Sequence, residues 1–154
     1  MVSVLFVCLG YICRSPAAEG ILRHMYEQSS GKQSLHVESC GLGSWHVGQL
    51  PHDQMREAAN ERGIVLLSRA QQFKSSFFEQ FDYILAADHI ILNELYALAK
   101  TPEHKAKVHL ISEYSKTYFR EEIPDPFYGG KEGFDRVLDM LEDSCQGLLD
   151  HLKP

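Results

Sequence analysis

The stretch VLFVCLGYICRSPAAEG, residues 4–20, decides the fold, because in it an apolar run ends at a cysteine and a short loop leads into a helical segment. Residues 2–7 are apolar and β-branched, which is typical of a buried strand. Pro16 stands where a helix can begin, since the first turn does not need the amide proton that proline lacks. The stretch therefore predicts a strand, a loop from Cys8 to Ser15 and a helix.

The rest of the chain continues this alternation. Further strands are predicted at residues 35–39, 81–88 and 107–111, and helices at residues 17–28, 52–63, 89–99 and 134–152, with Gly63 closing the second helix. Alternating strands and helices favour an α/β fold: one domain over residues 1–154, with a parallel sheet covered by helices on both faces. Such sheets bind ligands beyond the carboxyl ends of their strands, and Cys8 lies at one of these ends.

Composition narrows the function classes. The chain has 154 residues, 44% of them hydrophobic, and a formal net charge of −6, which argues against general nucleic-acid binding. No export signal and no apolar run long enough for a membrane span are found, so we expect a cytoplasmic protein that does not bind membranes. The four cysteines, Cys8, Cys13, Cys40 and Cys145, are then expected to be reduced thiols.

The loop after the first strand has the chemistry of an anion site. Free backbone amides and the positive end of the helix dipole face its hollow, and Arg14 adds a planar fork that can hold two oxygens of a tetrahedral anion. The same surroundings favour the thiolate of Cys8, and Ser15 can donate its hydroxyl to that sulfur. A thiolate beneath a bound phosphate is placed for in-line attack, which gives a phosphocysteine. Packing alone is the favoured role for Cys40 and Cys145, and for Cys13 both roles remain open.

A leaving phenolate or alkoxide also needs a proton, which a thiolate cannot supply. Asp125 in IPDPFYGG, residues 123–130, is the best candidate, because two prolines hold it on a stiff loop after the last predicted strand. An ordinary Asp-Pro turn is the alternative. The loop aromatics Trp45, Phe127 and Tyr128 can wall a slot that suits an aryl phosphate.

Together these segments resemble the low-molecular-weight protein tyrosine phosphatases along nearly the whole chain. The matching segments are VLFVCLGYICRSPAAEG, SWHVG, FDYILAAD and IPDPFYG. The resemblance implies a four-stranded parallel sheet, Cys8 as nucleophile, Arg14 as phosphate clamp, Ser15 as thiolate stabiliser and Asp125 as general acid. It also implies that Cys13 can form a reversible disulfide with Cys8 under peroxide. The expected substrate-binding residues are Leu9, Gly10, Tyr11, Ile12, Cys13, Trp45, Phe127 and Tyr128.

Tyr11 departs from the family pattern, which has Asn in a left-handed turn, bonded to a Ser and a His elsewhere. Ser39 matches that Ser and is the expected loop support, whereas Ser68 stands where the family has His. Tyr tolerates positive φ poorly, so the loop is either weakened or braced differently. We favour different bracing, because the four catalytic groups are all retained, and we expect the Tyr11 ring to line the pocket rim.

Several alternatives use the same residues. Thioredoxin-coupled arsenate reductases share the anion loop but need two further cysteines, and this chain has none between Cys40 and Cys145. A phosphotyrosine-binding module weakened by Tyr11 would need neither Cys8 nor Asp125. Cysteine spacing does not favour a zinc site, and no metal or organic cofactor is implied. The expected partners are phosphotyrosine proteins, including a tyrosine autokinase if the source is bacterial, and the chain is expected to be a monomer.

Overall fold

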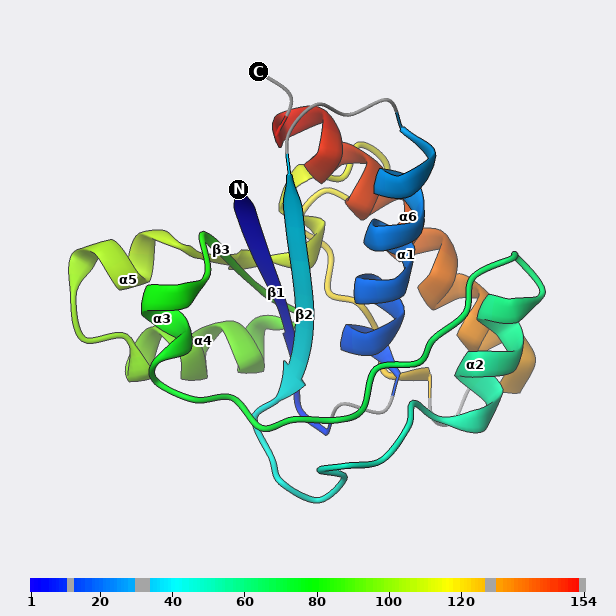
Figure 1. Ribbon diagram of the computed structural model, residues 1–154, viewed down its shortest axis with the longest axis horizontal. Helices are drawn as coiled ribbons and strands as arrows, with labels where there is room; N and C mark the ends of the chain where they lie inside the picture. Colours follow the sequence, from blue (N-terminus) through cyan, green and yellow to red (C-terminus); the bar gives the residue numbers. More distant parts are fainter. Residues whose placement is uncertain (11–12, 30–33, 127–129, 153–154) are drawn as a thin grey trace.

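Three layers build the molecule, with a sheet between two groups of helices (Figure 1). The computed structural model describes residues 1–10, 13–29, 34–126 and 130–152. The strands are β1 (Val2–Cys8), β2 (Leu35–Gly41), β3 (Tyr83–Ala86) and β4 (Val108–Leu110). The helices are α1 (Arg14–Gln28), α2 (Asp53–Asn60), α3 (Phe77–Gln80), α4 (His89–Leu98), α5 (Pro102–Ala106), the 3-10 helix η1 (Ile111–Tyr114) and α6 (Gly130–Leu152). The predicted α/β fold is thereby confirmed.

The sheet has the strand order β2-β1-β3-β4, and every neighbouring pair is parallel. Strand β1 pairs with β2 along its full length, from Val2 opposite Leu35 to Cys8 opposite Gly41. Because all strands run the same way, their carboxyl ends meet at one edge, the lower one in Figure 1. Cys8 is therefore delivered to the edge where parallel sheets bind ligands.

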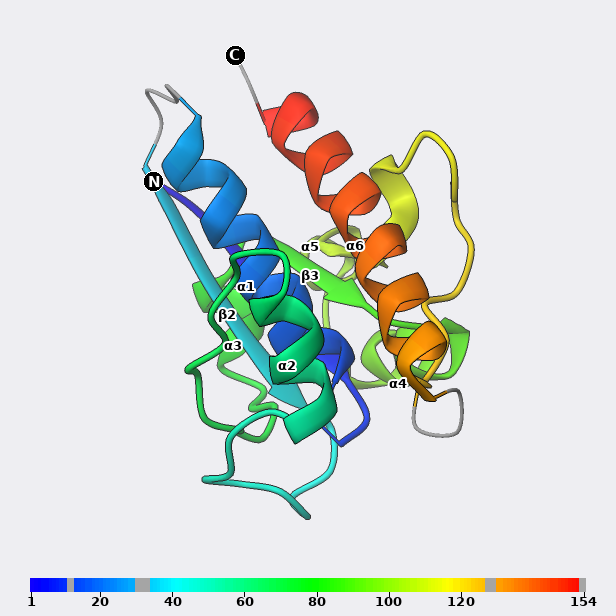
Figure 2. The same ribbon diagram turned by 90° about the vertical axis from the view of Figure 1, so that its right-hand side faces the viewer.

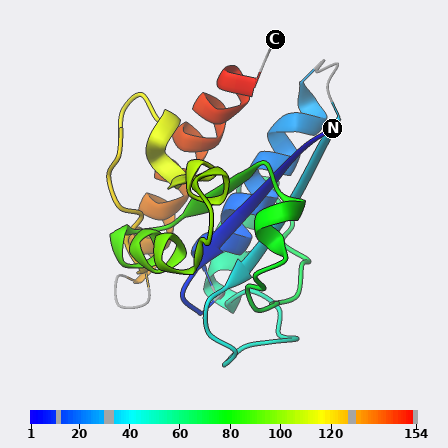
Figure 3. The same ribbon diagram turned by 90° about the vertical axis from the view of Figure 1, so that its left-hand side faces the viewer.

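Side chains of β1 alternate between two buried cores. Val4 and Phe6 pack into the larger core with α1, α2 and α6, which Figure 2 shows in front of the sheet. Leu5 and Val7 point to the opposite face, into a core built with α3 and α4 (Figure 3). All four residues are fully buried. This continuous apolar run is what a central parallel strand needs, because neither of its faces meets water.

Several boundaries differ from the predicted ones. Helix α1 begins at Arg14 rather than Pro16, so Arg14 and Ser15 belong to the first helical turn and the loop is shorter than expected. This is possible because proline fits anywhere among the first-turn positions, whose amides lack intrahelical partners. Helix α2 spans Asp53–Asn60, and Gly63 (φ +79°) ends the turn after it. The short α3, α5 and η1 were not predicted, since four or five residues show no periodicity.

Candidate active site

A pocket of about 160 Å³ opens at the carboxyl edge of the sheet. Residues from three separated segments line it: Cys8, Leu9, Gly10, Cys13, Arg14, Trp45 and Asp125. The structure thus brings together the predicted nucleophile, phosphate clamp and general acid. Tyr11, Ile12, Phe127 and Tyr128 lie outside the described residues.

Cys8 is the last residue of β1 and is only 2% exposed. Its Sγ lies 2.9 Å from Oγ of Ser15, which stands in the first turn of α1. The same hydroxyl can donate to the carbonyl oxygen of Cys40, at 3.2 Å. Since a hydroxyl has one proton, Ser15 can satisfy the Cys40 carbonyl or the Cys8 sulfur, but only one of them at a time.

Arg14 is buried and fixed by two acceptors. Its NH1 donates to Asp88 Oδ2 at 2.7 Å and to the carbonyl oxygen of Ile123 at 2.9 Å. Within the described part of the chain both bonds use NH1, so the remaining nitrogens of the guanidinium are left for an anion. This arrangement orients the fork before any ligand binds, which lowers the entropic cost of binding one.

Asp88 contacts the site through Arg14, although the sequence analysis did not assign it. Its Oδ2 holds Arg14, while its Oδ1 accepts the amide proton of Ile91 and caps α4. A signal was present, because Asp88 is an acid placed directly after a buried strand, at the ligand edge of the sheet. What the sequence could not show is that β3 lies beside β1, which puts Asp88 within reach of Arg14.

Asp125 reaches the pocket through Ile123, two residues before it. The amide of Ile123 donates to the carbonyl oxygen of Ala87 at 2.9 Å, and its own carbonyl accepts from Arg14. The Ile123 side chain is buried, whereas Asp125 is exposed at the pocket. The loop is thus anchored to the end of β3 and presents its carboxylate to the opening.

The loop after β2 forms the opposite rim. Its amides at Leu42 and Gly43 donate to the carbonyl oxygens of Cys8 and Leu9, each at 2.9 Å. Trp45 is 67% exposed and its indole ring lies against Gly43, where an added Cβ would stand 1.8 Å from ring atom Cζ3. The structure thus places Trp45 in the lining of the pocket.

The buried carboxylate of Glu19 connects Ser39 and Ser68, the two residues that the sequence analysis discussed together with Tyr11. Ser39 donates to Glu19 Oε1 and Ser68 to Oε2, and Glu19 is 3% exposed. Arg23 NH2 lies 2.7 Å from Glu19 Oε2 and also donates to the carbonyl oxygen of Val37. Ser39 and Ser68 are therefore held from α1, and Arg23 supplies positive charge to the same network.

Burial raises the pKa of three thiols. It is the main cause that lifts the pKa of Cys13 to about 12, with smaller contributions from the negative charges of Asp125 and Cys8, partly offset by Arg14. Burial, Cys8 and Glu38 raise the pKa of Cys40 well above the usual range, and burial followed by Glu142 raises that of Cys145. These three thiols stay protonated near neutral pH.

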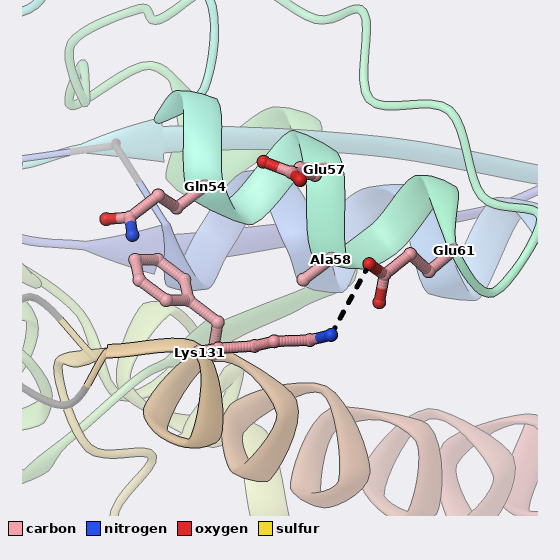
Figure 4. A pocket seen from close by; sticks show the side chains of 6 residues that line it. Gln54, Glu57, Ala58, Glu61 and Lys131 are labelled. Carbon is pink, nitrogen blue, oxygen red and sulfur yellow. Dashed lines mark ion pairs between the residues drawn. The ribbon is translucent and has the colours of Figure 1, made fainter.

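A second hollow lies between α2 and α6, and Figure 4 shows it from close by. Lys131 Nζ lies 3.6 Å from Glu61 Oε1 across it. Its described lining is Gln54, Glu57, Ala58, Glu61, Lys131 and Phe134, which includes neither a thiol nor an imidazole. The nucleophile is thus found in the pocket at the sheet edge and not in this hollow.

Comparisons with known proteins assign the chain to a family. Residues 3–154 match the family described as low molecular weight phosphotyrosine protein phosphatase, so the chain belongs to that family. A Schizosaccharomyces pombe phosphatase of this name is 38% identical over 149 residues, covering 96% of this chain and 95% of that protein. The chain is accordingly a phosphatase, and its family implies phosphotyrosine proteins as substrates.

Two solved structures show the same fold. An Entamoeba histolytica protein tyrosine phosphatase with Hepes in its active site has a TM-score of 0.93 and 38% identity, covering 99% of this chain and 97% of that one. A Drosophila arginine phosphatase has a TM-score of 0.89 and 35% identity, and the match covers 98% of each chain. A phosphatase named for tyrosine and one named for arginine therefore share this fold.

Proposed function

We propose that the protein hydrolyses phosphotyrosine through a phosphocysteine on Cys8. The observation that carries this proposal is the convergence of Cys8, Arg14 and Asp125 on one pocket of about 160 Å³. Arg14 and the loop amides hold the phosphate oxygens, and the α1 dipole adds positive potential at the same point. These groups supply the positive field without a metal or organic cofactor.

In the first step the Cys8 thiolate attacks phosphorus, the sulfur–phosphorus bond forms and the bond to the tyrosine oxygen breaks. Asp125 donates its proton to the leaving phenolate. In the second step the ionised Asp125 takes a proton from water, whose oxygen attacks phosphorus and releases phosphate and the thiolate. Ser15 serves both steps, since its hydroxyl can turn from the Cys40 carbonyl to the ionised sulfur at 2.9 Å.

The exposed ring of Trp45 supports an aryl phosphate as substrate, because it can flank the phenyl ring of phosphotyrosine at the pocket rim. Measuring kcat/KM with phosphotyrosine, phosphoserine and phosphoarginine peptides of one sequence tests this choice. We expect phosphotyrosine to be favoured at least tenfold and Cys8→Ser to abolish all turnover. Equal or better use of phosphoarginine would assign the protein to the other activity seen in this fold. Binding of phosphate without turnover would favour the binding module.

Cys13 lines the same pocket, which supports its proposed role as redox partner of Cys8. Peroxide converts the Cys8 thiolate to a sulfenic acid, and the Cys13 thiol then displaces hydroxide from it, giving the disulfide and water. Mass spectrometry after brief peroxide treatment should find a Cys8–Cys13 bridge, and Cys13→Ser should make the loss of activity irreversible.

A cytoplasmic monomer that acts on a tyrosine autokinase remains our proposal for a bacterial host. Among the described residues, no helix is long and apolar enough to cross a membrane.

A further inference from the structure

A shallow groove is lined in part by the residues that follow Trp45, which itself lines the catalytic pocket. It has a volume of about 570 Å³, and its lining includes His46, His52 and Arg69. His46 directly follows Trp45, so the two hollows share one rim. In Figure 1 this loop and the extended segment that carries Arg69 both lie where β2 ends. A peptide whose phosphotyrosine fills the pocket can therefore lay its neighbouring residues over the groove.

The groove is built before any peptide binds. The amide of Gly48 donates to the carbonyl oxygen of Ala70 at 2.9 Å. The amide of Ala70 donates in turn to the carbonyl oxygen of Gln49 at 2.8 Å. Arg69 NH1 donates to the carbonyl oxygen of Gly48, also at 2.9 Å. These bonds tie the Trp45 loop to the segment opposite and hold the guanidinium across the groove. Preorganisation of this kind lowers the entropic cost of binding.

The charge of the groove is positive. Among the described residues that line it, Asp53 is the only acid, and it is ion-paired with Arg56. For Arg69 no carboxylate among the described residues lies within ion-pair distance, so its charge is not neutralised. His46 and His52 are neutral or cationic and never anionic. This positive groove stands out in a chain whose formal net charge is −6.

In two neighbouring hollows, acidic side chains outnumber basic ones. The one between α2 and α6 is lined by two glutamates and one lysine, and the one between α2 and residues 65–67 by two acids and one arginine. The charges therefore favour an acidic peptide in the groove over these two hollows.

We propose that the groove recognises acidic residues flanking the phosphotyrosine, with Arg69 as the principal contact. This inference rests on the proposed function, because a peptide reaches the groove only when its phosphotyrosine occupies the pocket. Since Arg69 is exposed, the discrimination it provides is modest, about three- to fivefold in kcat/KM. It acts through the peptide and leaves the chemistry of the phosphoryl group unchanged.

The test compares two phosphotyrosine peptides that differ only in carrying glutamate or glutamine on both sides of the tyrosine. For the native protein we expect kcat/KM to be about three- to fivefold higher with glutamate. Arg69→Gln should remove this preference, and Arg69→Lys should keep it. Both variants should hydrolyse p-nitrophenyl phosphate like the native protein, because the backbone bonds of Gly48 and Gln49 to Ala70 still hold the Trp45 loop. Lys105→Gln is the matched control, because it removes one exposed positive charge from α5, on the opposite face of the sheet.

A preference that survives in Arg69→Gln, or is absent from the native protein, would overturn the inference. Salt gives a second measurement that needs no variant: raising NaCl from about 25 to 300 mM should shrink the preference of the native protein, because exposed charges are screened. A preference unaffected by salt would likewise count against it. If the native protein did not hydrolyse p-nitrophenyl phosphate at all, the proposed function itself would be refuted.

Discussion

Gly43 gives the indole ring of Trp45 its place at the pocket rim. A Cβ at residue 43 would meet three ring atoms at 2.5 Å or less, and no backbone is among these nearest atoms. We therefore expect Gly43→Ala to displace the ring while leaving the fold intact. Because Trp45 is the only tryptophan, fluorescence reports on it alone. The variant should emit at a shifted wavelength and lose several-fold in kcat/KM for aryl phosphates; an unchanged spectrum would show that the ring does not rest on Gly43.

We expect Asp88 to act on the reaction through Arg14, its ion-pair partner. In Asp88→Asn the charged partner of Arg14 is lost, whereas the cap of α4 is retained, since Asn caps helices as well as Asp. We expect kcat for p-nitrophenyl phosphate to fall on the order of tenfold to a hundredfold, with a melting temperature close to that of the native protein. A kcat within twofold of the native value would show that Asp88 only caps the helix.

The residues that the sequence could and could not assign differ in one physical respect. Cys8, Arg14 and Asp125 are recognisable because their chemistry and spacing follow from one strand–loop–helix unit and one rigid turn. Asp88 and Glu19 contact the site through residues far along the chain: Asp88 bonds Arg14, 74 residues away, and Glu19 bonds Ser39, 20 residues away. Their roles depend on which strands are adjacent, and residue pattern alone does not reveal that.

Helix α6 packs so closely on η1 that Gly147 has no room for a side chain. A Cβ there would stand 1.8 Å from the carbonyl oxygen of Tyr114, which is backbone and cannot move aside cheaply. Gly147→Ala should therefore lower the free energy of unfolding by about 1–3 kcal/mol. Gly133→Ala on the same helix is the control, since its nearest contact is an ordinary 3.5 Å. It should be neutral or slightly stabilising, because alanine favours helix.

Urea denaturation of both variants measures the difference. Equal stability of Gly147→Ala and Gly133→Ala would contradict the close packing of α6 on η1.

The contact between α6 and η1 also shows why a long helix can be predicted from sequence while the short element it packs on cannot. The apolar period of residues 134–152 revealed α6, whereas η1 spans only four residues and carries no periodic signal.

Across the fold, buried thiols make stability depend on alkaline pH. The pKa of Cys13 is raised from 9.0 to about 12 and that of Cys145 is raised further, so the folded state keeps protons that the unfolded state loses. The stability that these protonated thiols give the fold is fully present below about pH 9. It is lost as pH rises through the pKa of each thiol in the folded state. Each thiol contributes up to about 1.4 kcal/mol per pH unit in that window.

Cys145→Ala isolates one of these contributions, because Cys145 is buried on α6 and its Sγ donates to the carbonyl oxygen of Ala18 at 3.7 Å. Between about pH 9 and 11, the free energy of unfolding should fall less steeply for the variant than for the native protein. Parallel curves from urea titrations would mean that the Cys145 thiol titrates alike in both states.

The central claim, a phosphocysteine on Cys8, is tested most directly by trapping it. Asp125→Asn should slow water attack more than phosphoryl transfer from p-nitrophenyl phosphate, since p-nitrophenolate leaves without a proton. The intermediate then accumulates, and rapid denaturation followed by peptide mass spectrometry can locate it. We predict one phosphoryl group on the peptide that contains Cys8, with a burst of p-nitrophenolate of matching amplitude. Phosphate on another residue, or turnover with no phosphoenzyme and no burst, would contradict the account.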